Sequence, residues 1–375
     1  MPSTPPRLPI SEPRALARWP GSGTADDGIA PPSPAPAPPV PIERAHAHQL
    51  VESLGRPLSA GNRVEPLLGA SRLAEALQRA IDGAVNHINL CGDLVPAAAG
   101  EQLAERLVGR LRAGVKVNLC CEGHGSLAAG AAALEQLAAA GVSLCGPAPP
   151  RGVLHAWVPW WRPTAAKAAP MLIVDGRRAI VGAGADGGGG TAGEANFALA
   201  IEGPALQRLQ RRFLREWLHR SRQPVQPARY FPPLLVAGTQ RLGITDGGDA
   251  APALRALHDA LGIACVGVNL VAATPPGRRL RLALASAAEH GVVVNILRSG
   301  LADATATASR CWTALEDRGV RVHALREGDD APPPGLCTID GVWSGFAASD
   351  SAPGLVVLDR PLARRLEQWL RPGQA

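Results

Sequence analysis

Hydrophobic residues in this chain repeatedly follow a helical spacing that leads directly into a short apolar run. Residues 71–85, SRLAEALQRAIDGAV, place apolar side chains on one helical face, and residues 86–92, NHINLCG, read as a strand. The same order returns in residues 251–262 and 263–273. Each pair of segments predicts a helix that precedes a strand.

Two longer segments repeat this pattern and place a glycine between the helix and the strand. Residues 100–122 contain Gly114 and residues 278–300 contain Gly291, each where the helical spacing gives way to a β-rich run. A glycine at this point is typical of a helix C-terminus. A third pair of segments has the same build: residues 133–146 with Gly141, and residues 311–325 with Gly319.

The equivalent positions keep a nearly constant separation along the chain. Ile88 and Val268 lie 180 residues apart, Gly114 and Gly291 lie 177 apart, and Gly141 and Gly319 lie 178 apart. A drift this small over two full units indicates an internal duplication, with a period far longer than that of solenoid repeats.

Two hairpins follow these units. Residues 170–182 turn at Asp175-Gly176, and residues 335–345 turn at Asp340-Gly341, a dipeptide that favours tight turns. The two aspartates lie only 165 residues apart, so the first half carries an insertion before its hairpin. That insertion contains the stretch LHAWVPWWRPTAAK.

Alternating helices and strands predict an α/β layered sheet in each half. We place the first half at residues 60–222 and the second at 241–372. Residues 223–240 are rich in proline and are interpreted as a linker, and residues 1–45 are a Pro- and Ala-rich tail that we expect to be disordered.

Composition and charge narrow the class of protein. The 375 residues are 46% hydrophobic, which is sufficient for a full core. The net charge of +6 comes almost wholly from arginine and allows a mildly basic face toward phosphates or anionic lipid. No basic run is long enough to indicate nucleic acid. No apolar stretch has the length of a signal peptide or a membrane span, so a cytoplasmic location is expected.

We expect neither a metal nor a cofactor. The seven cysteines are odd in number, scattered and mostly set in apolar runs, which is typical of buried thiols in a reducing compartment. The CCEGH stretch brings Cys120, Cys121 and His124 together without a second cluster to complete a metal site. The GAGADG stretch at 182–187 matches a dinucleotide fingerprint but continues as a loop and a strand, where that fingerprint requires a helix.

With these features in order, the chain resembles the phospholipase D superfamily, and within it bacterial cardiolipin synthases. The resemblance spans roughly residues 60–372 and includes the hairpin LIVDGRRAIVG, the later TIDGVWSG, and the closing LVVLDRPLARRLEQWL. It implies a duplicated phospholipase D-like fold: two mixed-sheet halves, flanked by helices, packed about a pseudo-two-fold axis through their hairpins.

The resemblance also implies a shared catalytic site, to which each half contributes a His-x-Lys-x4-Asp motif. In that family one histidine attacks the phosphodiester and the other protonates the leaving alkoxide. The lysines neutralise phosphate oxygens, and each aspartate supports the histidine of its own half. By this pattern, Asp175 and Asp340 are the two supporting carboxylates.

The chemical positions of both motifs are lost in this sequence. The histidine positions hold Ala168 and Pro333, and the lysine positions hold Pro170 and Gly335. Loss of a lone nucleophile in an unrelated hydrolase lowers turnover on the order of a millionfold. We therefore predict a catalytically degenerate member of the family.

Other residues of the insertion are candidates for substitute roles. His155 and Lys167 precede Asp175 and are interpreted either as contacts for a phosphate or as surface loop residues. Trp157, Trp160 and Trp161 are interpreted either as an interfacial contact with lipid or as packing of a long loop on the core.

Two functions remain from the sequence. The first is a cardiolipin synthase-like pseudoenzyme that binds phospholipid or a phosphodiester, or that assists an active homologue. The alternative is an active phosphatidyltransferase or phosphodiesterase that uses substitute residues. Anionic phospholipid at the membrane surface and an active homologue are the expected partners. The expected location is cytoplasmic or peripheral on the inner membrane, with nucleic acid and a transmembrane segment not expected.

Overall fold

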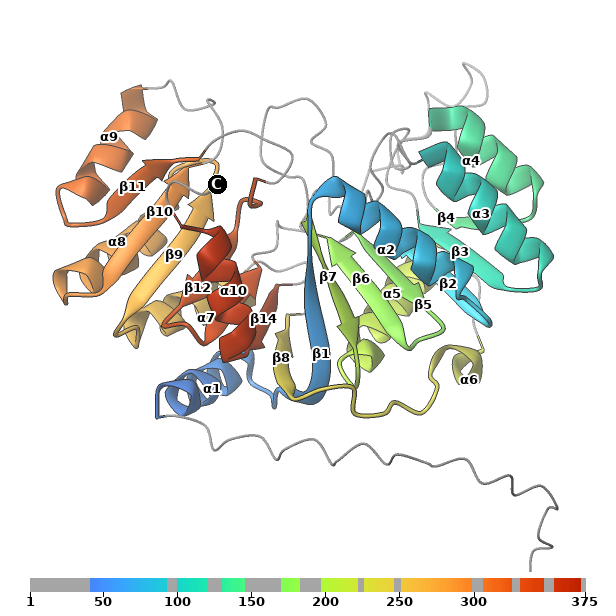
Figure 1. Ribbon diagram of the computed structural model, residues 1–375, viewed down its shortest axis with the longest axis horizontal. Coiled ribbons are helices and arrows are strands. Elements are labelled where there is room, and N and C mark those ends of the chain that lie inside the picture. The colour runs from blue at the N-terminus through green and yellow to red at the C-terminus, as the bar shows by residue number, and fades with distance from the viewer. Residues whose placement is uncertain are drawn as a thin grey trace, which may run out of the picture. The chain divides into compact units, whose positions relative to one another are not determined.

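The computed structural model describes the chain in several stretches, and every statement below concerns these residues: 41–92, 100–120, 130–145, 170–182, 197–221, 226–245, 251–298, 306–325, 331–346 and 354–371. All of them belong to one compact unit, which lies within residues 38–375 (Figure 1).

The elements of the first half alternate as the sequence predicted. Its helices are α2 (Ala70–Asp82), α3 (Gly100–Arg112), α4 (Gly130–Ala139) and α5 (Leu206–Ser221); α1 (Pro41–Leu54) precedes this half and the short α6 (Pro227–Tyr230) follows it. Its strands are β1 (Ser59–Leu68), β2 (His87–Cys91), β3 (Lys116–Cys120), β4 (Ser143–Cys145), β5 (Met171–Val174), β6 (Arg178–Gly182) and β7 (Phe197–Glu202).

The second half repeats the order. Its helices are α7 (Ala251–Gly262), α8 (Arg278–Glu289), α9 (Ala306–Glu316) and α10 (Arg360–Trp369). Its strands are β8 (Gln240–Ile244), β9 (Gly267–Ala272), β10 (Val293–Arg298), β11 (Arg321–Ala324), β12 (Leu336–Ile339), β13 (Trp343–Phe346) and β14 (Leu355–Leu358).

All of these strands form one sheet, in the order β11-β10-β9-β12-β13-β14-β8-β1-β7-β6-β5-β2-β3-β4. From the β11 edge to β8, the strands follow the same order as their counterparts in the first half do from the β4 edge to β1. The two halves meet in the middle of the sheet, where β1 pairs antiparallel with β8. Strands β2, β3 and β4 are parallel, as are β9, β10 and β11, whereas the hairpins are antiparallel. The predicted mixed α/β sheet and the duplication are thus confirmed.

Local chemistry explains these elements. Every position of β2 is buried, as expected for a parallel strand that is covered on both faces. Gly114 and Gly291 follow α3 and α8, and both have a φ of 88°. Because this left-handed conformation is strained for other residues, the glycines fix where the two helices end.

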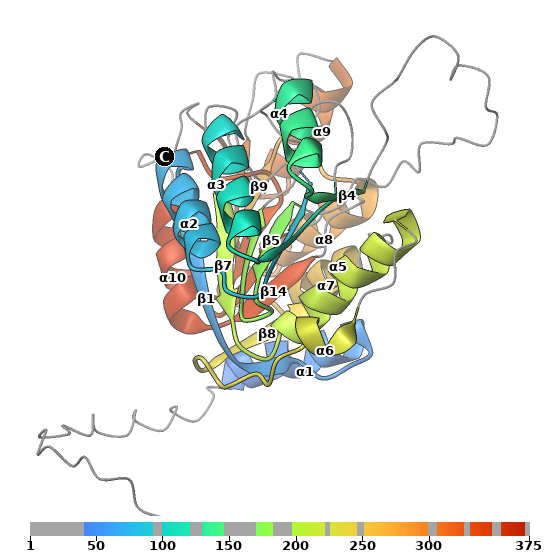
Figure 2. The same ribbon diagram turned by 90° about the vertical axis from the view of Figure 1, so that its right-hand side faces the viewer.

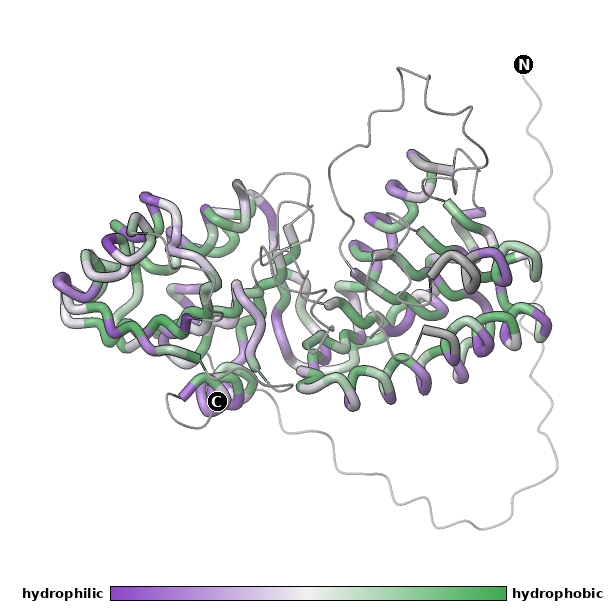
Figure 3. The backbone as a smooth tube through the Cα atoms, turned by 90° about the horizontal axis from the view of Figure 1, so that it is seen from above, coloured by the Kyte–Doolittle hydropathy of each residue, from purple (hydrophilic) through white to green (hydrophobic). Residues whose placement is uncertain are grey.

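Helices cover both faces of the sheet within each half. In the first half, α2, α3 and α4 enclose one apolar cluster, while α5 packs on the opposite face. Figure 2 shows the strands between α2 and α3 on one side and α5 on the other. In the second half, α1, α7, α8 and α9 enclose one face and α10 packs on the other. In Figure 3 the helices alternate between hydrophilic and hydrophobic colours, whereas the strands are mainly hydrophobic.

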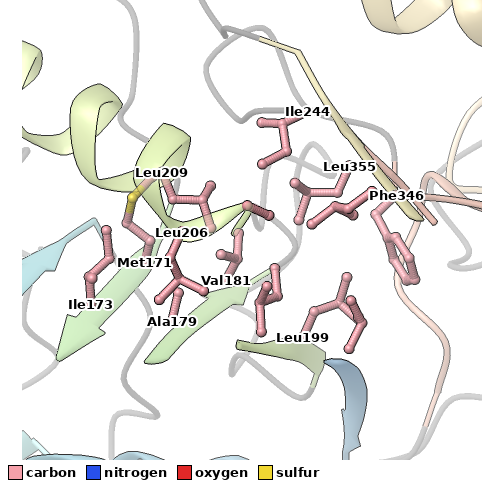
Figure 4. Close-up of a cluster of buried hydrophobic side chains, with 14 of the residues drawn as sticks. Met171, Ile173, Ala179, Val181, Leu199, Leu206, Leu209, Ile244, Phe346 and Leu355 are labelled. Atoms are coloured by element: carbon pink, nitrogen blue, oxygen red, sulfur yellow. The ribbon is translucent and has the colours of Figure 1, made fainter. Parts of the chain in front are cut away.

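A single apolar cluster contains residues of both halves. Leu199, Leu206 and Leu209 come from the first half and Ile244 and Leu355 from the second (Figure 4). Phe197 and Phe346 stack across the junction, with ring centroids 5.4 Å apart. The halves are therefore joined by the pairing of β1 with β8 and by a shared core to which strands of both hairpins contribute. The pseudo-two-fold axis itself stays a prediction.

The structure also differs from the expected domain limits. Helix α1 begins at Pro41, inside the segment interpreted as a tail, and its Leu50 packs in the core of the second half. The segment interpreted as a linker contains α6, whose Tyr230 is buried in the shared core. Among the described helices, none is long and apolar enough to cross a membrane.

Candidate functional site

The beginnings of the two hairpins approach one another at the shared core. Pro170 immediately precedes β5, and its carbonyl accepts a hydrogen bond from Gly182 at 2.9 Å, while Gly182 pairs with Ala198 beside Phe197. In the second hairpin Phe346 pairs with Leu336, the residue after Gly335. The stacking of Phe197 on Phe346 therefore brings together the ends of the hairpins that carry the motif positions.

None of the described histidine and lysine positions of the motifs carries a reactive side chain. Pro170 and Pro333 are buried, and Gly335 donates its backbone N–H to Val271 at 2.8 Å with a φ of 86°. A proline or a glycine supplies neither a nucleophile nor a cation. Ala168 lies outside the described residues.

The substitute candidates also lie outside the part of the chain that the structure describes. They are His155, Trp157, Trp160, Trp161 and Lys167. Their interpretation as phosphate or lipid contacts stays a prediction.

Asp175 lies at the opposite end of β5, in the hairpin turn, with a φ of 52°. Its carboxylate accepts hydrogen bonds from the backbone N–H groups of Val85, Asn86 and His87 at 2.9, 2.7 and 2.8 Å. A carboxylate with three such donors fastens the hairpin turn to the chain that enters β2. These contacts therefore give Asp175 a structural role in the turn and not the predicted role of supporting a histidine at position 168.

Asp340 has the same arrangement in the second half, with a φ of 54°. It accepts hydrogen bonds from the backbone N–H groups of Cys265, Val266 and Gly267 at 3.1, 2.7 and 3.1 Å. Its Oδ2 also lies 2.9 Å from Nε2 of His46, and both side chains are buried. Burial acts to raise the pKa of Asp340, but the bonds from His46 and the backbone outweigh it and hold that pKa below its usual value.

No role was predicted for His46 from the sequence, because it directly follows the segment interpreted as a tail, residues 1–45. The helical spacing of the sequence around His46 could have indicated that it is buried. His46, Leu50 and Ser53 are spaced four and three residues apart, which places them on one helical face, and all three are buried in α1.

Asparagine amides form a second pair of equivalent contacts. Asn118 donates from Nδ2 to Oδ1 of Asn89 at 2.7 Å, and Asn295 donates to Asn269 at 3.0 Å. Each pair lies directly opposite in register on neighbouring parallel strands. Because the donors and acceptors recur with the repeat spacing, the duplication extends to polar contacts inside the sheet.

His87 is a buried histidine outside the predicted motifs. It is completely buried, and its ring lies 4.6 Å from that of Tyr230 between centroids. Burial lowers the pKa of His87 to about 4; Asp175 opposes this shift and Arg229 adds to it. The imidazole is therefore neutral at pH 7 and sits beside the hairpin turn, away from the motif positions.

Three cysteines align across the first half of the sheet. Cys91 lies opposite Cys120 and Cys120 lies opposite Cys145, with the sulfurs of the latter pair 2.7 Å apart. All three are buried free thiols, and hydrogen bonding to Cys145 and Cys91, with burial, raises the pKa of Cys120. The Cys120 thiol therefore stays protonated at neutral pH. Cys265, in contrast, is exposed. Within the described stretches, no group of three His, Cys, Asp or Glu side chains has the arrangement of a metal site.

Comparison with known proteins supports the fold alone. No family model and no curated protein matches the chain. The structure of phosphatidylserine synthase from Haemophilus influenzae is similar with a TM-score of 0.57 and 11% identity, over 86% of this chain and 89% of that one.

Two further solved structures match too loosely to carry an argument. Polyphosphate kinase from Porphyromonas gingivalis has a TM-score of 0.48 at 14% identity, over 83% of this chain and 50% of that one. Nuc from Salmonella typhimurium, a phospholipase D family member, has a TM-score of 0.29 at 18% identity, over 35% of this chain and 91% of that one. With its duplicated mixed sheet flanked by helices, this chain has a phospholipase D-like fold.

Proposed function

We propose that this chain is a cardiolipin synthase-like protein that has lost phosphoryl-transfer chemistry and keeps its fold to bind a phospholipid or another phosphodiester. It acts alone or beside an active homologue, in the cytoplasm or at the inner face of the membrane. The similarity to phosphatidylserine synthase supports the fold, and the remainder rests on the residues at the motif positions.

The proposal depends on which residues occupy the histidine and lysine positions at the hairpin ends. Phosphodiester displacement requires a nucleophile, an acid for the leaving alkoxide and fixed cations. The hairpin ends instead present Pro170, Pro333 and Gly335, and the left-handed backbone of Gly335 disfavours a lysine there. Both hairpin aspartates are engaged by backbone amides at the far ends of their strands.

Turnover of phosphatidylglycerol by the purified chain tests the loss of chemistry. We expect neither cardiolipin nor free glycerol above the background of a mock purification, while an active cardiolipin synthase in the same assay produces both. Turnover that disappears in His155→Ala or Lys167→Ala would contradict the proposal and favour an active transferase with substitute residues.

Cosedimentation with vesicles tests the retained binding. We expect binding to vesicles that contain phosphatidylglycerol and weak binding to phosphatidylcholine alone. If the insertion contacts lipid, replacement of Trp157, Trp160 and Trp161 by alanine reduces sedimentation. Equal sedimentation with both lipids would contradict recognition of an anionic phospholipid.

A further inference from the structure

An arginine-rich pocket opens beside the junction of the halves, between the chain that joins α1 to β1 and the first turns of α5. Its volume is about 490 Å³, within the usual range of about 300 to 1,000 Å³ for small-molecule sites. Five lining residues are arginines: Arg56, Arg208, Arg211, Arg212 and Arg215. The lining includes no carboxylate.

The fold determines why these arginines share one pocket. Leu209, Phe213 and Trp217 hold the apolar face of α5 in the shared core, so the intervening arginines lie on the other side of the helix. Arg56 comes from the chain before β1, where its Nη2 donates to the carbonyl of Ile244 at 2.5 Å. Segments far apart in the sequence thus contribute charge of one sign to one site.

The chemistry of the lining favours a phosphate ester. Guanidinium groups present planar forks of N–H donors that suit phosphate oxygens, and five of them line this pocket. The α5 N-terminus adds positive potential at the same end. The remaining wall is apolar and includes Leu54, Leu58 and Leu242, which suits the organic part of an ester better than a bare ion.

We infer that this pocket binds a phosphate-bearing small molecule or lipid headgroup. The site is separate from the motif positions: it adjoins Pro204 and Ala205, beyond the end of β7 at Glu202, whereas Phe197 begins that strand near the hairpin ends. The inference therefore stands whether or not the proposed function holds. A pocket of this volume suits one ester, whereas single-stranded nucleic acid requires a groove along several nucleotides.

Calorimetric titration of the full chain with glycerol 3-phosphate and with inorganic phosphate tests the inference. We expect the ester to bind more tightly, and Arg211→Gln with Arg215→Gln, two exposed lining residues, to weaken it at least tenfold. The matched control is Arg278→Gln with Arg279→Gln, which removes the same charge from exposed positions of α8. Thermal unfolding of both variants shows that the fold is retained.

Vesicles containing phosphatidylglycerol distinguish the two sources of the ligand. If the wild type and the control variant bind glycerol 3-phosphate and the pocket variant does not, the ligand is a soluble ester. Binding of vesicles alone, lost in the same variant, identifies a lipid headgroup. Absence of binding to any phosphate probe, equal loss in the control, or pocket-dependent binding of an oligonucleotide alone would overturn the inference.

Discussion

Nε2 of His46 lies 2.9 Å from Oδ2 of Asp340, and the two side chains are 1% and 0% exposed. The contact joins helix α1 to the turn between β12 and β13, across 294 positions of sequence. Since the same carboxylate accepts bonds from the backbone at the start of β9, one aspartate connects three segments that lie far apart in the sequence.

Removal of this histidine should destabilise the fold. His46→Ala leaves a buried carboxylate with only its backbone partners, so we expect a loss of about 2 to 3 kcal/mol in the free energy of unfolding. Urea denaturation monitored by circular dichroism measures it. His48→Ala on the same helix is the control, because that side chain is 76% exposed and should cost less than about 0.5 kcal/mol.

The pKa of Asp340 gives the same contact a pH dependence. Because its folded pKa is lowered, the stabilisation is present above the unfolded value, about 3.9, and is lost as pH falls through the folded value. The stability difference between the wild type and Asp340→Asn should therefore be constant near neutrality and shrink below about pH 4. A difference that grows on acidification would contradict the assignment.

Asp175 should affect stability through its backbone contacts and its left-handed conformation. Asp175→Gly removes the three hydrogen bonds and accepts the φ of 52°, so we expect a loss of about 2 kcal/mol. Asp175→Ala adds backbone strain of about 1 kcal/mol to that loss. Equal stabilities of the alanine and glycine variants would show that the turn relaxes.

His87 should make the protein less stable in mild acid. Its folded pKa of about 4 means that protonation between pH 6.5 and 4 favours the unfolded chain. Relative to His87→Leu, which has no titrating group, the wild type should lose about 3 kcal/mol across this range. Parallel pH profiles of the free energy of unfolding for the two proteins would refute the lowered pKa.

Restoring the histidine and lysine residues of the motif should destabilise the protein, because the local backbone conformation does not suit them. Gly335→Lys places a side chain at a φ of 86°, and we expect a loss of about 1 to 2 kcal/mol in the free energy of unfolding. Gly335→Ala is the matched variant that separates backbone strain from the effect of the lysine. The combined variant with Ala168→His, Pro170→Lys and Pro333→His should form little cardiolipin, because productive geometry is needed within about 0.5 Å. Robust turnover by that variant would show that the natural chain lacks only the catalytic side chains and that its backbone geometry is still productive.

The sequence determined the fold class and the duplication. Helical and strand periodicities are local properties, and spacings such as that of Gly114 and Gly291 are visible without a structure because both glycines end equivalent helices. The loss of the histidine and lysine positions at Ala168, Pro170, Pro333 and Gly335 is also a matter of sequence alone.

Tertiary structure decided the contacts between distant segments. Neither the pairing of His46 with Asp340 nor the assembly of Arg56 with the arginines of α5 has a local signal, since each depends on how the elements pack. The role of Asp175 was likewise decided by packing. The sequence of a hairpin turn does not distinguish a carboxylate that supports a catalytic histidine from one that accepts hydrogen bonds from a neighbouring strand. The pairing of β2 with β5 brings the backbone amides of residues 85–87 within reach of Asp175.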